Sequence, residues 1–568
     1  MVTTNERRSS SSSSTIHSVA VDINNDNNLE KQQPQKDTTT SQAPATRAAK
    51  QTWRTVILLT GILLCNFTVS MNSTVIAPAM NTIATELGSQ ELQTWIATSF
   101  MVAMNSSQPL SGKFSDIFGR KPVYLSGLFF FLAGSLINAL SPSIRVLIIG
   151  RTVQGFGAGG MMSMVYIIIT DITPIQWRPR LQSLLAVVYG LASVVGTLVG
   201  GAFVDYLTWR WDFWLNLIIA GVAAVILIFF LHETANIQQE PILTKFKRID
   251  FLGVVFAIGT ITNLLLALNY GPQYGWNDPH SFGPFIAAGV SLICLVIVEG
   301  WIAKEPILPR QVIFNRGVLP VYLYMICLGV SFIGTLYFGP ILFQAVFGAD
   351  STGSGIRLIP FMALLIVGSV GSGFLLRKFP YIKFFICLGA ASNMIGYGLF
   401  YTVNESSNWG RQAAVLVFCG FAFGLSQQNC ILSTQYSAPR KYLAVATGLN
   451  QFCMFLAFSI SVAVYQTLFS TFLKAQYTVV DPQILAIAKE YGAINNYLYI
   501  RDMPAEAQPP IIHAYMEALH NVFIIPIVAA GLSLICALCT RNVRFGQPLG
   551  GTQQPPPQQK NEKVVEDA

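Results

Sequence analysis

Charged residues are scarce in this sequence. Asp, Glu, Lys and Arg make up 11% of its 568 residues, against roughly 25% in soluble domains. Hydrophobic residues make up 52%, and the mean hydropathy is +0.51. This number of charges cannot cover the surface of a soluble protein. We therefore expect a multi-pass integral membrane protein in contact with the lipid bilayer. The net charge of +8 is not gathered in a basic patch with interleaved aromatics, which argues against a nucleic-acid partner.

The sequence also lacks the patterns that carry catalysis and ATP hydrolysis. It has no Walker sequence, so ATP is not the expected energy source. It has no nucleophile–base or metal-ligand constellation, so we expect no enzyme, no cofactor and no metal. The single C-x-x-C, Cys536 and Cys539, falls in an apolar run and is interpreted as packing. No cleavable signal peptide precedes the first apolar run, which begins after about fifty polar residues.

Apolar runs near the ~20 residues that span hydrocarbon recur along the chain and predict fourteen transmembrane helices. The expected helices are residues 55–77, 92–112, 122–141, 146–168, 182–204, 212–232, 250–270, 283–302, 317–340, 355–376, 381–402, 411–436, 442–466 and 515–540. An even number of crossings places both termini on one side of the membrane.

The helices and the polar segments around them divide the chain into five parts. These are a disordered cytosolic tail (1–54), an N-terminal six-helix bundle (55–233), an inserted helix pair with linkers (234–316), a C-terminal six-helix bundle (317–540) and a second disordered cytosolic tail (541–568). The tails are assigned as disordered because they are poor in hydrophobic residues. We therefore expect an all-α polytopic membrane protein.

The distribution of Lys and Arg sets the orientation. Of the 35 such residues, most fall in segments on the side of the termini, which the positive-inside rule identifies as cytosolic. The six on the other side are Arg145, Arg210, Arg411, Lys474, Lys489 and Arg501, and Arg151 and Arg357 lie at or within helices. Both termini are therefore predicted in the cytosol.

A polar turn between the second and third runs reads Gly-Lys-Phe-Ser-Asp-Ile-Phe-Gly-Arg-Lys over residues 112–121. Its glycines allow a turn and a close helix approach, its cations favour the cytosolic side, and its acid can pair with an arginine. The stretch resembles the signature loop between helices 2 and 3 of the major facilitator superfamily, and departs from it at Phe114. The residues concerned are Gly112, Asp116, Gly119, Arg120 and Lys121.

The resemblance implies two six-helix bundles around a central cavity and secondary transport by alternating access. Later runs resemble the fourteen-helix drug:proton antiporter branch of this family, in which two helices are inserted between the bundles. One such run is Trp209 to Asn216, whose aromatics also fit an interfacial belt.

The fourth helix carries an arginine at membrane depth. A guanidinium there costs at least ~2.5–3.5 kcal/mol on insertion scales, so we expect Arg151 to face the interior, with Gln154 beside it. Gly155 and Gly159 follow at i+4 and i+8, on the same face. An interhelical staple is the structural alternative. The run resembles the family's helix 4 motif, which implies a role for Arg151 in proton coupling.

An acid meets basic residues again in the loop after the fourth helix. Asp171 and Arg178 resemble the family's helix 4–5 loop. We hypothesise that they form a cytoplasmic gate network with Asp116 and Arg120, which opens and closes during transport. Simple anchoring of the topology is the alternative.

The fifth helix is rich in glycine. Its residues Gly190, Gly196, Gly200 and Gly201 include the spacing Gly-x-x-x-Gly, which permits close helix crossing. The run resembles the family's antiporter motif, but Thr197 stands where a proline normally follows the glycine.

The first helix departs from the branch most informatively. Where the branch usually has an acid facing the pathway, this chain has Asn72, which cannot titrate. We find no mid-membrane Asp or Glu on the other core helices. Neutral or anionic substrates are therefore favoured, and proton coupling would use a gate acid such as Asp116 or Asp171, or be absent.

Amides and one aromatic complete the candidate pathway. Polar side chains in hydrocarbon usually face a cavity or another helix. The amides could therefore contact substrate or hydrogen-bond to other helices. The tyrosine could line the cavity or pack in the core. These candidates are Tyr189, Gln427, Gln428 and Asn450.

The expected function is a secondary active transporter that exports small organic molecules such as drugs, toxins or metabolites, with protons as a candidate coupling ion. We expect a monomer, in the plasma membrane rather than the vacuolar membrane. The alternatives are a vacuolar basic amino-acid transporter, a passive facilitator, and a non-transporting nutrient sensor on the same fold.

Overall fold

A computed structural model describes residues 43–89, 92–174, 177–232, 241, 244–245, 248–303, 305–349, 351–494 and 497–546. The chain divides into the units Met1–Thr52 and Trp53–Ala568; α1 runs from the first into the second, and the other helices discussed below belong to the second. Most of the two predicted tails lies outside the described residues. Within those residues the fold is helical, with one isolated bridge between Tyr381 and Arg544.

The long helices follow the predicted runs. The N-terminal half holds α1 (Ala43–Glu86), α2 (Gln93–Phe118), α3 (Arg120–Ala139), α4 (Ile144–Ile172), α5 (Arg178–Tyr206) and α6 (Trp211–Phe230). Next come α8 (Phe251–Tyr274) and α9 (Pro279–Ile297), which a π turn (Val298–Ile302) extends. The C-terminal half holds α11 (Leu319–Ile341), α13 (Ile359–Leu375), α14 (Ile382–Phe400), α15 (Trp409–Ser437), α16 (Leu443–Tyr477) and α18 (Gln508–Cys539).

Short elements join the long helices. They are α10 (Arg310–Ile313), a π turn (Leu342–Val346), α12 (Ser351–Arg357), α17 (Pro482–Glu490) and two 3-10 turns (Arg440–Tyr442 and Tyr497–Asp502). The segment with α17 lies between α16 and α18.

Thirteen helices among the described residues are long and apolar enough to cross a membrane. The fourteenth predicted crossing is α2, whose hydropathy is lowered by buried polar side chains such as Asn105, Ser107 and Gln108. The all-α polytopic fold is confirmed. α1 differs from its predicted bounds, because it begins at Ala43 and is helical through residues assigned to the tail.

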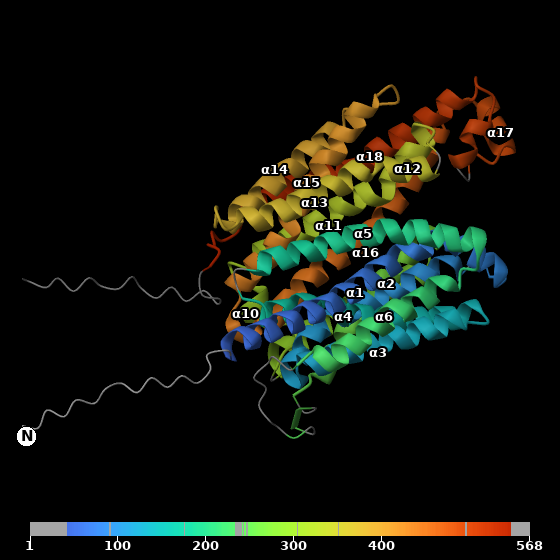
Figure 1. Ribbon diagram of the computed structural model, residues 1–568. Helices are drawn as coiled ribbons and strands as arrows, with labels where there is room; N and C mark the ends of the chain where they lie inside the picture. The colour runs from blue at the N-terminus through green and yellow to red at the C-terminus, as the bar shows by residue number, and fades with distance from the viewer. Residues whose placement is uncertain are drawn as a thin grey trace, which may run out of the picture. The chain divides into compact units, whose positions relative to one another are not determined.

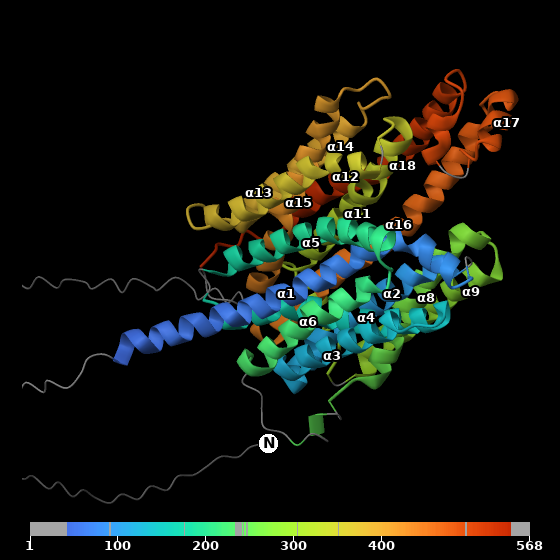
Figure 2. The ribbon, with the colours of Figure 1, turned by 45° about the vertical axis from the view of Figure 1, so that its right-hand side comes forward.

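The two halves repeat one packing pattern. In Figures 1 and 2 the first half is drawn in blue to green and the second in yellow to red. In the first half α2 and α3 pack on α4, and in the second α13 and α14 pack on α15. α3 packs on α6 as α14 packs on α18. Contacts between the halves are also paired, since α2 meets α16 and α13 meets α5. This is the arrangement expected of two similar bundles related by an axis along the membrane normal.

The inserted pair lies at one of these contacts between the halves. α8 and α9 pack on each other, and α8 also contacts α2 and α16. A hydrophobic cluster joins the three helices, with Val102 of α2, Ile261 and Leu265 of α8, and Leu456 and Ile460 of α16. The pair therefore covers the α2–α16 contact.

Glycines determine how closely two pairs of helices approach. On α4, a Cβ at Gly155 would overlap the carbonyl of Phe100, and one at Gly159 the carbonyl of Met104, so both glycines face α2. On α5, a Cβ at Gly200 would overlap the carbonyl of Val75 in α1. These backbones approach closely because no side chain intervenes.

The other three predicted packing glycines of α5 differ in how closely their neighbours approach. A Cβ at Gly196 would overlap Thr74 Oγ1 and Met71 O of α1, so this residue belongs with Gly200. A Cβ at Gly190 would lie 3.9 Å from Met362 Sδ, an ordinary contact, and one at Gly201 would meet open space. The close crossing of α5 over α1 therefore uses two of the four glycines.

Adjacent positions on α5 provide a matched test of this packing. We expect Gly200→Ala to destabilise the folded protein by about 1–3 kcal/mol, because the new methyl group must displace the α1 backbone. Gly201→Ala should leave stability unchanged or raise it slightly. Unfolding in detergent, followed by circular dichroism, measures both. Equal destabilisation by the two variants would contradict the close α1–α5 contact.

Candidate functional site

Arg151 lies at the centre of a buried polar network in the N-terminal half. Its side chain is 1% exposed. Its Nε donates to the carbonyl of Ile96 in α2 at 2.9 Å, and its Nη1 donates to Asn72 Oδ1 in α1 at 3.2 Å. The guanidinium also lies over the ring of Phe100, 4.4 Å from its centroid. Arg151 thus joins α1, α2 and α4. These contacts fit both sequence-based interpretations, the one in which Arg151 faces the interior and the one in which it links neighbouring helices.

Amides extend this network to α3. Gln154 Oε1 accepts from Arg151 Nη1 at 3.0 Å and from Asn138 Nδ2 at 3.0 Å. Gln154 Nε2 donates to Ser135 Oγ at 2.7 Å. Asn72 Oδ1 is shared, because Asn216 Nδ2 of α6 donates to it at 2.9 Å. Five helices therefore contribute to one set of hydrogen bonds around a single cation.

The same site contains an acid that the sequence analysis missed. Asp212, in the first turn of α6, is 0% exposed and interacts electrostatically with Arg151. Neither carboxylate oxygen has a hydrogen-bond partner within the described part of the chain. The sequence analysis found no mid-membrane acid on the core helices and passed over Asp212, which lies buried at the start of α6.

The aromatic run around Asp212 explains why the sequence analysis missed this acid. The sequence placed this run in an interfacial belt, where an acid is unremarkable. Instead Trp209 and Phe213 are buried, at 1% and 0% exposure, whereas Trp211 is 43% exposed. The spacing of Trp209, Asp212, Phe213 and Asn216 is that of one buried helical face, and this was the signal available in the sequence.

A second group of polar contacts lies where α1 ends and α6 begins. Glu86 Oε1 accepts from Arg210 Nη1 at 2.7 Å, and Glu86 Oε2 accepts from Trp209 Nε1 at 2.8 Å. The hydrogen bond from Arg210 lowers the pKa of Glu86 below its usual value. A lowered pKa means that this contact contributes stability above the unfolded-state pKa and loses it as the pH falls.

The opposite end of the bundle carries the predicted gate residues. We call it the gate end: α2, α4, α13 and α15 end there, and α5 and α16 begin there. Arg120 Nη1 donates to Asp116 Oδ1 at 2.8 Å, and Arg120 Nε donates to Asp171 Oδ2 at 3.0 Å. Arg178 interacts with Asp171 electrostatically but makes no ion pair with it among the described residues, and its Nε donates to the carbonyl of Thr173 at 3.2 Å.

The remaining signature residues at the gate end contact other helices. Gly119 has φ of +105° and forms the link between α2 and α3, a conformation that favours glycine. Lys121 Nζ donates to the carbonyl of Ile228 in α6 at 2.9 Å. A Cβ at Gly112 would lie 3.0 Å from Ala444 O of α16, so this glycine lies where the two halves meet.

Another ion pair at this end ties α2 to the segment after the inserted helices. Lys113 Nζ and Arg248 Nε each lie 2.9 Å from a carboxylate oxygen of Glu305. Partial burial raises the pKa of Glu305, but the hydrogen bonds from Arg248 and Lys113 outweigh it, so the net pKa is lowered. Glu299 is engaged separately, since it accepts from the backbone N–H groups of Ile307 and Leu308.

Polar contacts join the two halves at the gate end. Ser183 Oγ of α5 donates to the carbonyl of Ser369 in α13 at 2.9 Å. Gln435 of α15 bridges to both α4 and α5, donating to Thr170 Oγ1 at 2.9 Å and accepting from Gln182 Nε2 at 3.4 Å. These contacts link α4 and α5 of the first half to α13 and α15 of the second. We call this set the seam contacts.

The predicted amides of the C-terminal half are buried but do not meet Arg151. Gln428 bonds within its own half, to Ser369 and Ser372 of α13. Asn450 Nδ2 donates to Thr434 Oγ1 at 2.9 Å. Gln427 is 5% exposed, and Tyr189 is half-buried against the main core cluster. Helix–helix bonding therefore accounts for Gln428 and Asn450.

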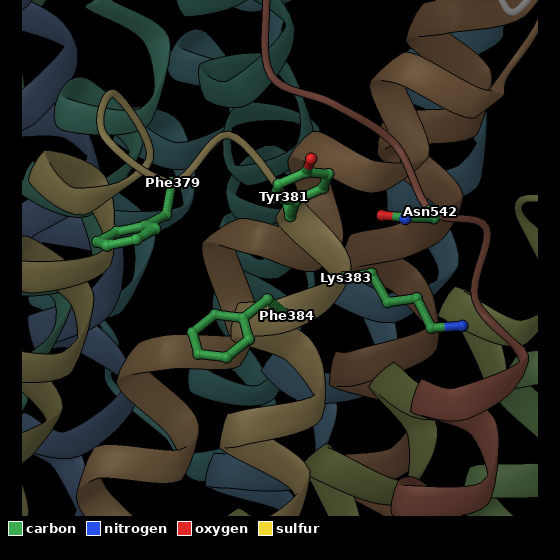
Figure 3. A pocket seen from close by; sticks show the side chains of 5 residues that line it. All are labelled: Phe379, Tyr381, Lys383, Phe384 and Asn542. Atoms are coloured by element: carbon green, nitrogen blue, oxygen red, sulfur yellow. The ribbon is translucent and has the colours of Figure 1, made fainter.

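The cavities of the C-terminal half are separate from this site. A pocket of about 400 Å³ is lined by Phe379, Tyr381, Lys383, Phe384 and Asn542. Figure 3 shows these side chains around the start of α14 and the segment after α18. None of them belongs to the Arg151 network. Among the residues the structure covers, no group of three or more His, Cys, Asp or Glu could hold a metal ion.

Comparisons with known proteins agree with the packing. Residues 62–462 match the family model of the Major Facilitator Superfamily. The chain is 31% identical over 492 residues to the efflux pump roqT of Penicillium rubens, covering 86% of this chain and 91% of that protein. It is 30% identical over 490 residues to the efflux pump bfoC of Aspergillus brasiliensis, covering 85% and 86%.

Two solved structures share the fold at low sequence identity. The human organic anion transporter MFSD10 (TETRAN) superposes with a TM-score of 0.53 at 15% identity, covering 84% of this chain and 99% of that chain. The proton:xylose symporter XylE superposes with a TM-score of 0.53 at 14% identity, covering 85% and 94%.

Double-mutant cycles test which cation belongs to the gate cluster. We expect Arg120→Ala and Asp171→Ala to show a coupling free energy of about 0.5–1 kcal/mol, because the two side chains form a partly buried ion pair. Arg178→Ala and Asp171→Ala should couple less, since Arg178 bonds a backbone carbonyl. Denaturation in detergent micelles measures both cycles. Stronger coupling to Arg178 would contradict the observed pairing.

Proposed function

We propose that this chain, which belongs to the major facilitator superfamily and is a multi-pass membrane transporter, exports small organic molecules by alternating access. Membership of this family also confirms that the chain is not an enzyme. The named efflux pumps among its relatives support the export direction. The substrates would be organic molecules of the size of drugs, toxins or metabolites.

The seam contacts are the observation that carries this proposal. They are neutral hydrogen bonds, one from a side chain to the backbone and two between side chains, each worth about 0.5–1.5 kcal/mol net. A handful of such bonds holds one end closed without locking it, so substrate binding can supply enough differential free energy to reverse the state. Glycine contacts such as Gly112 against Ala444 let the halves meet without bulky side chains.

The orientation follows from the positive-inside rule. With both termini in the cytosol, the gate end would be the cytosolic end, and the seam contacts would hold the transporter closed on that side. The Arg120 cluster lies at that end and would break and reform as the halves rock. We assign the protein to the plasma membrane, where an efflux pump removes its substrate from the cell.

Proton antiport is the energy source we propose. The sequence argued against it because Asn72 replaces the acid of the first helix. Asp212 removes that argument, since it is a buried carboxylate that interacts electrostatically with Arg151. It also removes the reason for restricting substrates to neutral or anionic molecules. Transport that continues unchanged when a protonophore is added would instead indicate a passive facilitator.

A vesicle assay tests transport and its coupling together. Purified protein in proteoliposomes should move Nile red, a neutral dye, or fluorescein, an anionic dye, and a protonophore should abolish accumulation driven by a pH gradient. Arg151→Ala should reduce transport at least tenfold while insertion stays normal, because the α1–α2–α4 contacts lose their common donor. Arg145→Ala, at the start of α4, is the matched control. Normal transport by Arg151→Ala would remove this residue from the pathway.

Cross-linking tests the alternating access of the gate end. In a variant lacking the nine native cysteines, Ser183→Cys with Ser369→Cys places two thiols across the seam contacts. A bifunctional thiol reagent should stop dye transport, and a reducible version should release it on reduction. Each single-cysteine variant should transport with or without reagent. Full transport by the cross-linked protein would show that this end does not open.

A further inference from the structure

Asp212 is the buried ionisable group whose surroundings most require an explanation. Its two oxygens are enclosed and make no hydrogen bond within the described residues. A buried carboxylate left unpaired is strongly destabilising, so such a group persists only where its charge is compensated or where it takes up a proton. The compensating charge here is Arg151, which interacts with it electrostatically.

The hydrogen bonds of Arg151 are made to neutral groups. Its acceptors are the carbonyl of Ile96 and the amide oxygens of Asn72 and Gln154. Protonation of Asp212 therefore breaks none of these bonds. The site can hold an ionised acid beside the cation, or a neutral acid while the cation stays fully hydrogen-bonded. A coupling carboxylate needs this tolerance of both states.

The position of Asp212 connects it to the helices that move. Asn216, one turn further along α6, donates to the same Asn72 oxygen that accepts from Arg151. Phe213 lies 6.0 Å from the Arg151 guanidinium. A change in the charge of Asp212 therefore acts directly on a contact between α1, α4 and α6.

Opposing influences act on the ionisation of this acid. Burial disfavours the charged form, whereas Arg151 and the positive end of α6 favour it. The neighbouring charges are otherwise engaged: Glu86 binds Arg210, and Lys121 of α3 bonds the other end of α6. From α5, Arg178 and Arg180 lie at the gate end. Among the described side chains, Arg151 is thus the one whose charge acts on Asp212.

We propose that Asp212 is the carboxylate whose protonation and deprotonation couple the proton gradient to transport, with Arg151 as its partner. The proton binds a carboxylate oxygen from one side of the membrane and leaves to the other, and no other bond is made or broken. Asn72, at the α1 position where the related branch has an acid, accepts a hydrogen bond from Arg151. The acid on α6 interacts with the same arginine and would take over the role of the missing acid on α1. The assignment rests on the proposed function.

The experiment separates coupling from transport itself. Wild type and Asp212→Asn are reconstituted, and Nile red and fluorescein are followed both in counterflow, without a pH gradient, and in gradient-driven accumulation. We expect Asp212→Asn to keep counterflow within about twofold and to lose gradient-driven accumulation at least tenfold. Glu405→Gln, which removes an exposed acid that contacts His513, is the control and should behave as wild type.

A second variant distinguishes a proton carrier from a structural acid. Asn72→Asp combined with Asp212→Asn returns a carboxylate to the oxygen position that accepts from Arg151, and should restore gradient-driven accumulation. A merely structural role for Asp212 gives no rescue and would overturn the proposal. So would retained gradient-driven accumulation in Asp212→Asn, or loss of its counterflow.

Infrared titration gives a readout that does not require transport. Wild type should show a protonated-carboxyl band that titrates with pH, and Asp212→Asn should lack it. Counterflow by wild type without any response to a pH gradient would overturn the assignment of Asp212 and leave the transporter function intact. If neither dye moves, export of these dyes is contradicted, and the infrared band alone supports or overturns the assignment.

Discussion

A guanidinium withdrawn from water is the constraint on which the N-terminal half depends. Arg151 is tolerable at membrane depth only because α1, α2 and α4 each present an acceptor to it. The acceptor on α2 is a main-chain carbonyl, which can be reached because Gly155 and Gly159 bring α2 against α4. One face of α4 therefore carries both the guanidinium and the glycines that bring its α2 acceptor within hydrogen-bonding distance.

α2 and α4 also connect the two chemically different ends of the bundle. Towards one end they hold Arg151 and its buried acceptors, and towards the gate end they supply Asp116 and Asp171 to Arg120. The first set is dry and built mainly from amides, whereas the second is partly exposed and ionic. Because the pair packs tightly along its length, a tilt imposed at one end is transmitted to the other as a rigid-body motion.

The sequence allowed the helices, the interior position of Arg151 and the family to be predicted. Hydrophobic run length identified the crossings, and the cost of a buried cation identified Arg151. Asp212 was missed because aromatic residues near a helix start resemble an interfacial belt, and depth in the membrane depends on how α6 packs. The position of Arg178 also depends on tertiary structure, since charge and proximity in the sequence could not show that it bonds Thr173 rather than Asp171.

The inserted helices have a consequence for how molecules dissolved in lipid could reach the interior. A two-bundle transporter has two lines along which its bundles face each other, here α2 with α16 and α5 with α13. α8 lies over the first and is fixed to both helices by aliphatic contacts. Sideways access from the bilayer would therefore be asymmetric: α8 covers the α2–α16 line, whereas α5 and α13 carry exposed apolar side chains such as Leu191, Leu198 and Val367.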